Sequence, residues 1–217
     1  MRRGIEAVLW DIGGVLTASP FEAFNQFEAA NGLPRDFIRG VNAMNPETNA
    51  WAQFESNQVD VDAFDDLFRA ETAALGHPVN GRRVLEILSG APRPRMIEAL
   101  RSCKRHFRVG AITNNMKPAS GSPPAVKDPA RAKIMDSAMS LFEVIVESSV
   151  ERVRKPDPAI YRIACERLGV EAARTVFLDD LGINLKPARA MGMHTIKVLN
   201  EDQALAELSE VTGLRFS

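Results

Sequence analysis

Side chains that bind metal ions and phosphate groups occur in four segments of the chain. Asp11 follows a short apolar run, and two adjacent aspartates, Asp179 and Asp180, follow another. The other candidates carry a hydroxyl, amide or ammonium group, and they are Thr113, Asn114, Asn115 and Lys155. Mg²⁺ accepts carboxylates together with phosphate oxygens, and the remaining groups donate hydrogen bonds to phosphate. These residue types therefore indicate a site that handles a phosphate group with a magnesium ion.

The segment that follows Asp11 has two further chemical properties. Gly13 and Gly14 carry no side chain, so their backbone can approach a ligand closely. We expect the Gly13 backbone to contact the phosphate. A carboxylate held against a metal-bound phosphate is also a nucleophile, and attack by Asp11 would give an aspartyl-phosphate intermediate.

Five short apolar runs have the pattern of buried parallel strands. They are rich in β-branched residues, end in polar or turn residues, and comprise Ile5–Trp10, Phe107–Thr113, Phe142–Val146, Thr175–Leu178 and His194–Leu199. Ligands of a parallel sheet bind outside the carboxyl ends of its strands. The polar residues that follow the first, second and fourth runs should therefore meet at one edge of the sheet.

Helical patterns lie between the last four of these runs. The clearest is Pro158–Leu168, with Asp157 at the N-cap position and Gly169 just past the end. Pro187–Met191 and Gln203–Val211 indicate two further helices. The alternation of strand and helix predicts an α/β fold with a doubly wound, Rossmann-like parallel sheet.

The chain between the first two runs has no strand pattern over about 90 residues, which is too long for a simple connection. Apolar side chains fall on one face of two predicted helices, Phe21–Ala30 and Val61–Leu75. We therefore expect a helical subdomain over residues 18–92. It would be inserted into an α/β core formed by residues 1–17 and 93–217.

The composition describes a folded protein without a charge bias. The 217 residues include 27 Lys+Arg and 28 Asp+Glu, and 45% are hydrophobic. This balance excludes a disordered chain and argues against nucleic-acid binding, which favours a basic excess. No apolar run approaches the roughly 20 residues of a membrane-spanning helix, and the first one is too short for a signal peptide.

Several conspicuous residues are interpreted as structural. Cys103 and Cys165 lack metal-site spacing and are too few for a disulfide framework, so we expect reduced thiols and a cytoplasmic protein. An acidic cluster in the insertion comprises Asp60, Asp62, Asp65 and Asp66. We interpret it as a solvated first helical turn with Asp62 at the N-cap. Lys117–Pro129 is rich in Pro, Ser and Gly, which predicts an exposed loop.

In their order and spacing, the four polar segments resemble the four motifs of the haloacid dehalogenase-like (HAD) superfamily. The matching segments read WDIGGVLT, AITNN, RKPDPAIY and VFLDDLGINLKPARAMGMHTI. The chain from VIVESSVE onward resembles one subgroup in particular. That subgroup holds the amino-terminal phosphatase domain of soluble epoxide hydrolase and the amino-terminal HAD-like domain of acyl-CoA dehydrogenase family members ten and eleven. The helical insertion corresponds to the cap that these proteins carry between their first two motifs.

The resemblance implies a role for each candidate residue. Asp11 would be the catalytic nucleophile and a metal ligand, and Thr113–Asn115 would hold the transferred phosphoryl group. Lys155 would neutralise the charge of that group and orient the nucleophile. Asp180 would be the acidic Mg²⁺ ligand, and Asp179 beside it would either bind the ion directly or support its ligands. The Gly13 backbone would also contact the ion. The substrate would be a small phosphorylated molecule, bound by a monomer or a homodimer.

One position departs from the pattern of the phosphatases in this superfamily. They usually read D-x-D, with the second aspartate as general acid and base, and Gly13 stands at that place. Three functions remain: a Mg²⁺-dependent phosphatase, a dehalogenase-type hydrolase, and a non-catalytic domain that binds phosphate or a partner. A dehalogenase needs neither the second aspartate nor a metal, which leaves the acidic pair without a purpose. We therefore predict a phosphatase that lacks a contribution of about 10²–10⁴ in rate, the usual effect of a general acid or base.

Overall fold

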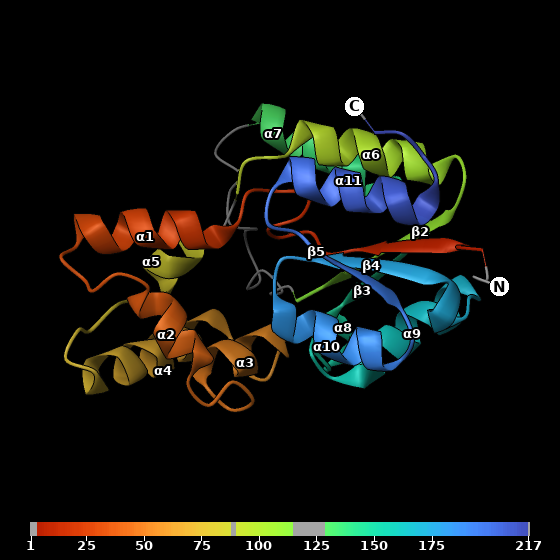
Figure 1. The fold of residues 1–217 in the computed structure, drawn as a ribbon. Helices are drawn as coiled ribbons and strands as arrows, with labels where there is room; N and C mark the ends of the chain where they lie inside the picture. The colour runs from red at the N-terminus through yellow and green to blue at the C-terminus, as the bar shows by residue number, and fades with distance from the viewer. Residues whose placement is uncertain (1–3, 88–89, 115–128, 217) are drawn as a thin grey trace.

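The computed structural model describes residues 4–87, 90–114 and 129–216, and a five-stranded parallel sheet forms its centre (Figure 1). The strands are β1 (Ala7–Trp10), β2 (Arg108–Thr113), β3 (Val144–Glu147), β4 (Thr175–Asp179) and β5 (His194–Lys197). Their spatial order is β3-β2-β1-β4-β5, and every neighbouring pair is parallel. The five predicted strands are confirmed, and β1 lies between the two strands that carry the other candidate residues.

Helices cover both faces of the sheet, as a doubly wound fold requires (Figure 1). On one face lie α6 (Pro94–Lys104), α7 (Pro129–Met139) and α11 (Glu201–Thr212); on the other lie α8 (Ser148–Glu151), α9 (Pro158–Leu168) and α10 (Gly182–Ala190). A 3₁₀ turn, η1 (Ala172–Arg174), precedes β4. Alternate β1 residues point to opposite faces, so Val8 and Trp10 join one apolar core and Ala7 and Leu9 join the other. This double burial explains why β1 is apolar at every position.

The predicted helix boundaries hold where capping residues mark them. For α9, the Asp157 side chain accepts a hydrogen bond from the Ala159 N–H, and Gly169 ends the helix with φ 63°. For α10 the prediction was wrong, because the helix begins at Gly182 and contains Pro187 inside it. The prediction started the helix at Pro187, because a proline is best tolerated in the first turn, where its missing N–H has no helical partner. In the structure the helix begins five residues earlier.

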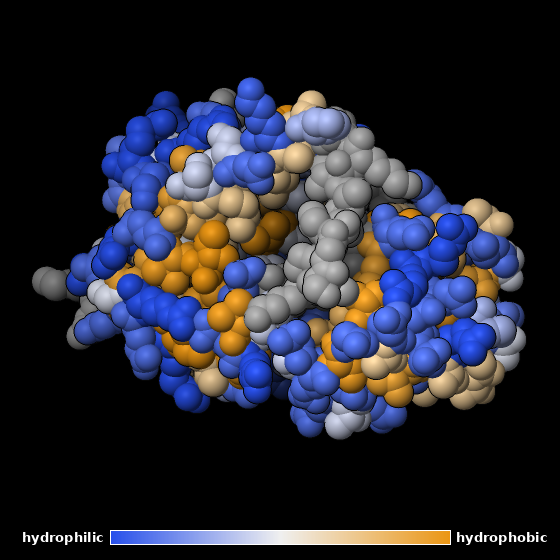
Figure 2. All heavy atoms as spheres, turned by 180° about the vertical axis from the view of Figure 1, so that it is seen from behind, coloured by the Kyte–Doolittle hydropathy of each residue, from blue (hydrophilic) through white to orange (hydrophobic). Residues whose placement is uncertain are grey.

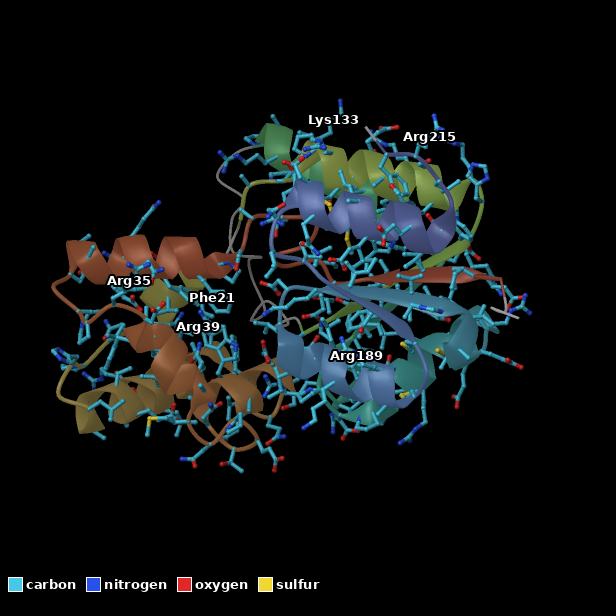
Figure 3. The ribbon with its side chains drawn as sticks, in the orientation of Figure 1. Phe21, Arg35, Arg39, Lys133, Arg189 and Arg215 are labelled. Carbon is cyan, nitrogen blue, oxygen red and sulfur yellow. The ribbon has the colours of Figure 1, made fainter. Side chains whose placement is uncertain are left out.

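Five helices between β1 and β2 form a separate lobe, which we call the cap (Figure 1). They are α1 (Pro20–Ala30), α2 (Phe37–Ala43), α3 (Ala50–Glu55), α4 (Val61–Ala74) and α5 (Gly81–Glu86). Their apolar faces enclose an aromatic core in which the Phe54 and Phe64 rings stack with centroids 4.6 Å apart. The Arg39 guanidinium of α2 lies 4.6 Å from the centre of the Phe21 ring of α1 (Figure 3). Seen from behind, hydrophilic side chains dominate the outer rim of both lobes (Figure 2).

The chain enters and leaves the cap at one point. Thr17 and Pro92 form an antiparallel bridge, the Ala18 N–H donates to the Ala91 carbonyl at 2.8 Å, and the Arg93 N–H donates to the Leu16 carbonyl at 2.8 Å. We propose that this double crossing marks the boundary between the cap, residues 18–92, and the core.

The acidic cluster of α4 and the two cysteines can now be compared with their structural interpretation. Asp60, and not Asp62, is the N-cap of α4, and its side chain accepts a hydrogen bond from the first turn. The predicted N-cap residue of α4 was therefore wrong by two positions, and Asp62 instead pairs with Arg82. Cys103 and Cys165 are both buried free thiols. No helix within the described residues is long and apolar enough to cross a membrane.

Candidate active site

The candidate residues converge where β1, β2 and β4 end. Asp11 directly follows β1, Thr113 is the last residue of β2, and Asp179 is the last residue of β4. The Asp11 N–H donates to the Leu178 carbonyl at 2.9 Å, which fixes the end of β1 beside β4. Each of Asp11, Asp179 and Asp180 offers a carboxylate oxygen within 4.8 Å of the other two. The three carboxylates therefore share one site, as the strand order requires.

Lys155 lies between two of these carboxylates. Its Nζ is 2.8 Å from Oδ1 of Asp11 and 2.8 Å from Oδ2 of Asp179, and its side chain is only 1% exposed. Burial alone would lower the pKa of Lys155, but the two carboxylates outweigh that effect and raise it. The ammonium group therefore stays charged and is held beside the predicted nucleophile.

The two adjacent aspartates have different surroundings. Asp179 is fully buried, and its oxygens accept hydrogen bonds from Lys155 and the Leu181 N–H. Nδ2 of Asn184 donates to both oxygens of Asp179, at 3.0 and 3.1 Å. Asp180 is less buried and accepts a hydrogen bond from the Ser19 hydroxyl at 3.2 Å. Asp179 thus pairs with Lys155, whereas Asp180 lies beside the cap boundary and is more exposed.

The charges of the site favour a divalent cation. Burial raises the pKa of Asp11 well above its usual value, and the charges of Asp179 and Asp180 raise it further, although Lys155 opposes them. Burial and the charge of Asp179 raise the pKa of Asp180 to about 6. When all three carboxylates are ionised, one lysine leaves two negative charges uncompensated. All three residues offer carboxylate oxygens, the ligand type that Mg²⁺ prefers.

Gly14 lets the loop after Asp11 pack against Asp180. Its φ is +75°, and a Cβ atom at this position would lie 2.2 Å from Oδ2 of Asp180. Its carbonyl accepts a hydrogen bond from Arg93 at 2.9 Å, where the chain returns from the cap. Gly13 has no such constraint, because its φ is not positive and a Cβ would meet nothing within 4 Å. The two glycines therefore serve different purposes.

Replacing Gly14 with alanine should displace Asp180 and destabilise the fold. We expect the free energy of unfolding to fall by about 1–3 kcal/mol, the usual effect of a strained backbone conformation. Mg²⁺ affinity, measured by calorimetry, should fall with it. Gly13→Ala is the matched control and should lose no stability, because its site is open. Equal losses in both variants would contradict the distinction.

The side chains at the end of β2 lie beside Lys155. Thr113 is buried and pairs with Glu147 of β3. The Asn114 side chain holds the backbone of Lys155 from both sides: its Oδ1 accepts from the Lys155 N–H at 2.8 Å, and its Nδ2 donates to the Lys155 carbonyl at 3.0 Å. Asn115 and residues 117–128 of the predicted loop lie outside the described residues, whereas Pro129 begins α7.

Three further polar residues belong to the site although the motif pattern did not identify them. Asn184 contacts Asp179 from the first turn of α10, and its sequence signal is a polar residue on the buried face of a helix. Ser19 of the cap boundary contacts Asp180. Glu55, at the end of α3, lies 3.4 Å from Nδ2 of Asn114. The last two come from the cap, where no local pattern reveals contact with the core.

Comparisons with known proteins identify the family of the chain. A family model described as a haloacid dehalogenase-like hydrolase matches residues 5–192. The chain is 30% identical to acyl-CoA dehydrogenase family member 10 of Mus musculus over 97% of its length, and 31% identical to bifunctional epoxide hydrolase 2 of the same species over 98%. It spans only 19% and 40% of those two relatives.

A solved structure has the same fold. A HAD-family enzyme from Bacteroides thetaiotaomicron, solved with magnesium and inorganic phosphate, matches with a TM-score of 0.57. The match covers 89% of this chain and 94% of that chain at 20% identity, so it bears on the fold. The family model spans the sheet through β4, the cap and every candidate residue of the site. The chain belongs to the haloacid dehalogenase-like hydrolases.

Proposed function

We propose that the protein is a Mg²⁺-dependent phosphatase that hydrolyses a small phosphomonoester through an aspartyl-phosphate on Asp11. The main support is the position of Lys155, whose Nζ lies 2.8 Å from a carboxylate oxygen of Asp11 and 2.8 Å from one of Asp179. Asp180 belongs to the same cluster of carboxylates. This arrangement supplies a nucleophile, a fixed positive charge for phosphate oxygens, and an acidic pocket for a cation. The magnesium and phosphate bound to the Bacteroides enzyme support the same assignment.

The chain's own residues have defined tasks in this reaction. A carboxylate oxygen of Asp11 attacks phosphorus, and the ester oxygen leaves with the electron pair of the broken P–O bond and takes a proton from solvent to become the alcohol. Water then attacks the phosphorus, releases inorganic phosphate and regenerates the carboxylate. The Lys155 ammonium and the polar groups of Thr113–Asn115 hold the phosphate oxygens, while Asp179 and Asn184 keep the ammonium in place.

Magnesium would be held by Asp11, Asp180 and the Gly13 backbone, and it would neutralise negative charge on the phosphate when bound. Asp179 would support these ligands, because its oxygens already accept hydrogen bonds from Lys155 and Asn184. The oxygen-only donor set is the kind that Mg²⁺ prefers.

Hydrolysis of a panel of phosphomonoesters, with Mg²⁺ and with a chelator, tests the proposal directly. We expect phosphate release with Mg²⁺ and none with the chelator. The panel should also contain 2-haloacids, since Gly13 would permit dehalogenation. Halide release that persists in the chelator would favour that alternative. Release of neither phosphate nor halide would favour a domain that only binds.

Asp180→Asn should abolish Mg²⁺ binding and most hydrolysis without destabilising the metal-free protein. Asparagine can still accept the Ser19 hydrogen bond, but it removes a buried charge. Because the folded-state pKa of Asp180 is raised to about 6, ionisation near pH 7 disfavours the folded state. Metal-free parent should therefore gain stability as the pH falls from 7 toward 4, and the gain should be smaller in the variant, which keeps only the part that other buried carboxylates such as Asp11 and Glu55 contribute. Thermal unfolding against pH measures the difference.

A further inference from the structure

Glu55 is a buried carboxylate that joins the cap to the core. It is the last residue of α3, and its side chain is 9% exposed. Its Oε2 lies 2.6 Å from Nη2 of Arg154 and 3.4 Å from Nδ2 of Asn114. Its Oε1 accepts from the Trp51 indole at 2.9 Å, and its backbone carbonyl accepts from the Ser148 hydroxyl at 2.7 Å. One cap residue thus contacts the polar segments after both β2 and β3.

These contacts lead directly to Lys155. Asn114 bonds both backbone groups of that residue, and Arg154 precedes it in the chain. Arg154 is held in turn by the cap, since its Nη1 donates to the Pro46 carbonyl at 2.7 Å. Glu55 therefore contacts both Asn114, which hydrogen-bonds to the Lys155 backbone, and Arg154, which precedes Lys155 in the chain.

We propose that Glu55 is a positioning residue that holds Lys155 at the phosphate site through Asn114 and Arg154. The inference rests on the proposed function, in which Lys155 neutralises the charge of the phosphate. Because Glu55 is part of α3, the position of the lysine depends on the cap being seated on the core. Binding of substrate beneath the cap and assembly of the catalytic site are then linked.

Contacts within the cap do not account for the burial of the charged Glu55 side chain. Burial raises the pKa of Glu55 although Arg154 opposes that effect, which shows that removal from water is disfavoured for the charge. Glu28 provides the comparison: it is 1% exposed, and it accepts hydrogen bonds from the Asp36 and Ile38 N–H groups at 2.8 Å each. These contacts of Glu28 lie inside the cap, whereas the Glu55 carboxylate contacts Trp51 of the cap and also Arg154 and Asn114 of the core.

Glu55→Gln and its matched control, Glu28→Gln, test the proposal. Hydrogen exchange, followed by mass spectrometry, should speed up in the segment 150–158 of Glu55→Gln and remain at the parent rate in Glu28→Gln. On a phosphomonoester that the parent hydrolyses, kcat of Glu55→Gln should fall by about 10- to 100-fold, the effect of misplacing a catalytic group by about 1 Å. Glu28→Gln should lower the melting temperature and keep the parent kcat.

The following outcomes decide the proposal. It is overturned if folded Glu55→Gln keeps both the parent exchange rate and the parent kcat, or if Glu28→Gln changes both as strongly. If Glu55→Gln fails to fold, Arg154→Gln tests the same link from the core side with the same readouts. If the parent hydrolyses no phosphomonoester, the proposed function fails, while the exchange measurement still decides whether Glu55 positions the Lys155 segment.

Discussion

Asp11→Asn should eliminate phosphomonoester hydrolysis, with a fall in kcat of about 10⁴- to 10⁶-fold, the range seen when a nucleophile is removed. An amide oxygen has almost no nucleophilic power, yet it can still accept the hydrogen bonds that Ile12 and Lys155 donate to Oδ1. Asp179 also continues to pair with Lys155. The variant should therefore fold and bind inorganic phosphate, and fail only in bond formation.

Thermal shifts separate binding from chemistry in this variant. Orthophosphate with Mg²⁺ should raise the melting temperature of parent and variant, because a ligand that binds only the folded state stabilises it. Beryllium fluoride, which bonds to a carboxylate, should stabilise the parent alone. Asp60→Asn, at the N-cap of α4, is a control remote from the site and should keep the parent kcat. Residual turnover above about one per cent in Asp11→Asn would identify another nucleophile.

Gly13→Asp should raise turnover of an alkyl phosphate by up to about 10²–10⁴-fold, the effect of a positioned acid and base. With glycine at this position, the leaving oxygen departs without a donor there and water attacks the intermediate without a base. The parent should therefore favour aryl phosphates, whose leaving groups need no protonation, and should show a burst with them. The backbone accepts the substitution, since φ is not positive and a Cβ meets nothing within 4 Å.

Gly13→Asn is the matched control, because it has nearly the same shape and cannot donate or accept the proton in the same way. Steady-state turnover on one aryl and one alkyl phosphate, measured for parent and both variants, separates the two effects. The aspartate should help the alkyl substrate more than the aryl one, and the asparagine should help neither. A folded Gly13→Asp without any gain would mean that another group already transfers the proton.

The parallel sheet and its polar edge could be predicted because their signals are local. The central strands are buried on both faces, so β1 is apolar throughout, β4 is apolar from Val176 to Leu178, and both stand out between helical patterns. Parallel pairing then brings the ends of β1 and β4 together, whatever the path of the chain between them. Asp11, Asp179 and Asp180 were consequently predicted as one cluster from their places in the sequence, and they form one.

The cap and its contribution to the site could not be predicted in the same way. Its helices α2, α3 and α5 have only seven, six and six residues, too few for a clear apolar period. Their stability comes from the aromatic cluster around Phe64, which is a tertiary feature. The contacts of Glu55 and Ser19 join segments far apart in the chain, and a pattern of neighbouring residues does not reveal such partners.

The central place of β1 also determines the order in which the molecule can form. Ala7 pairs with Arg108 on one side and Thr175 on the other, so β1, which precedes the other four described strands in the chain, gains its second neighbour only after β4 has been synthesised. The cap helices meet neighbours close in sequence and can fold much earlier. Until β4 emerges, β1 presents an open, apolar edge to other chains. A chain truncated before Thr175 should therefore aggregate, even though its cap is complete.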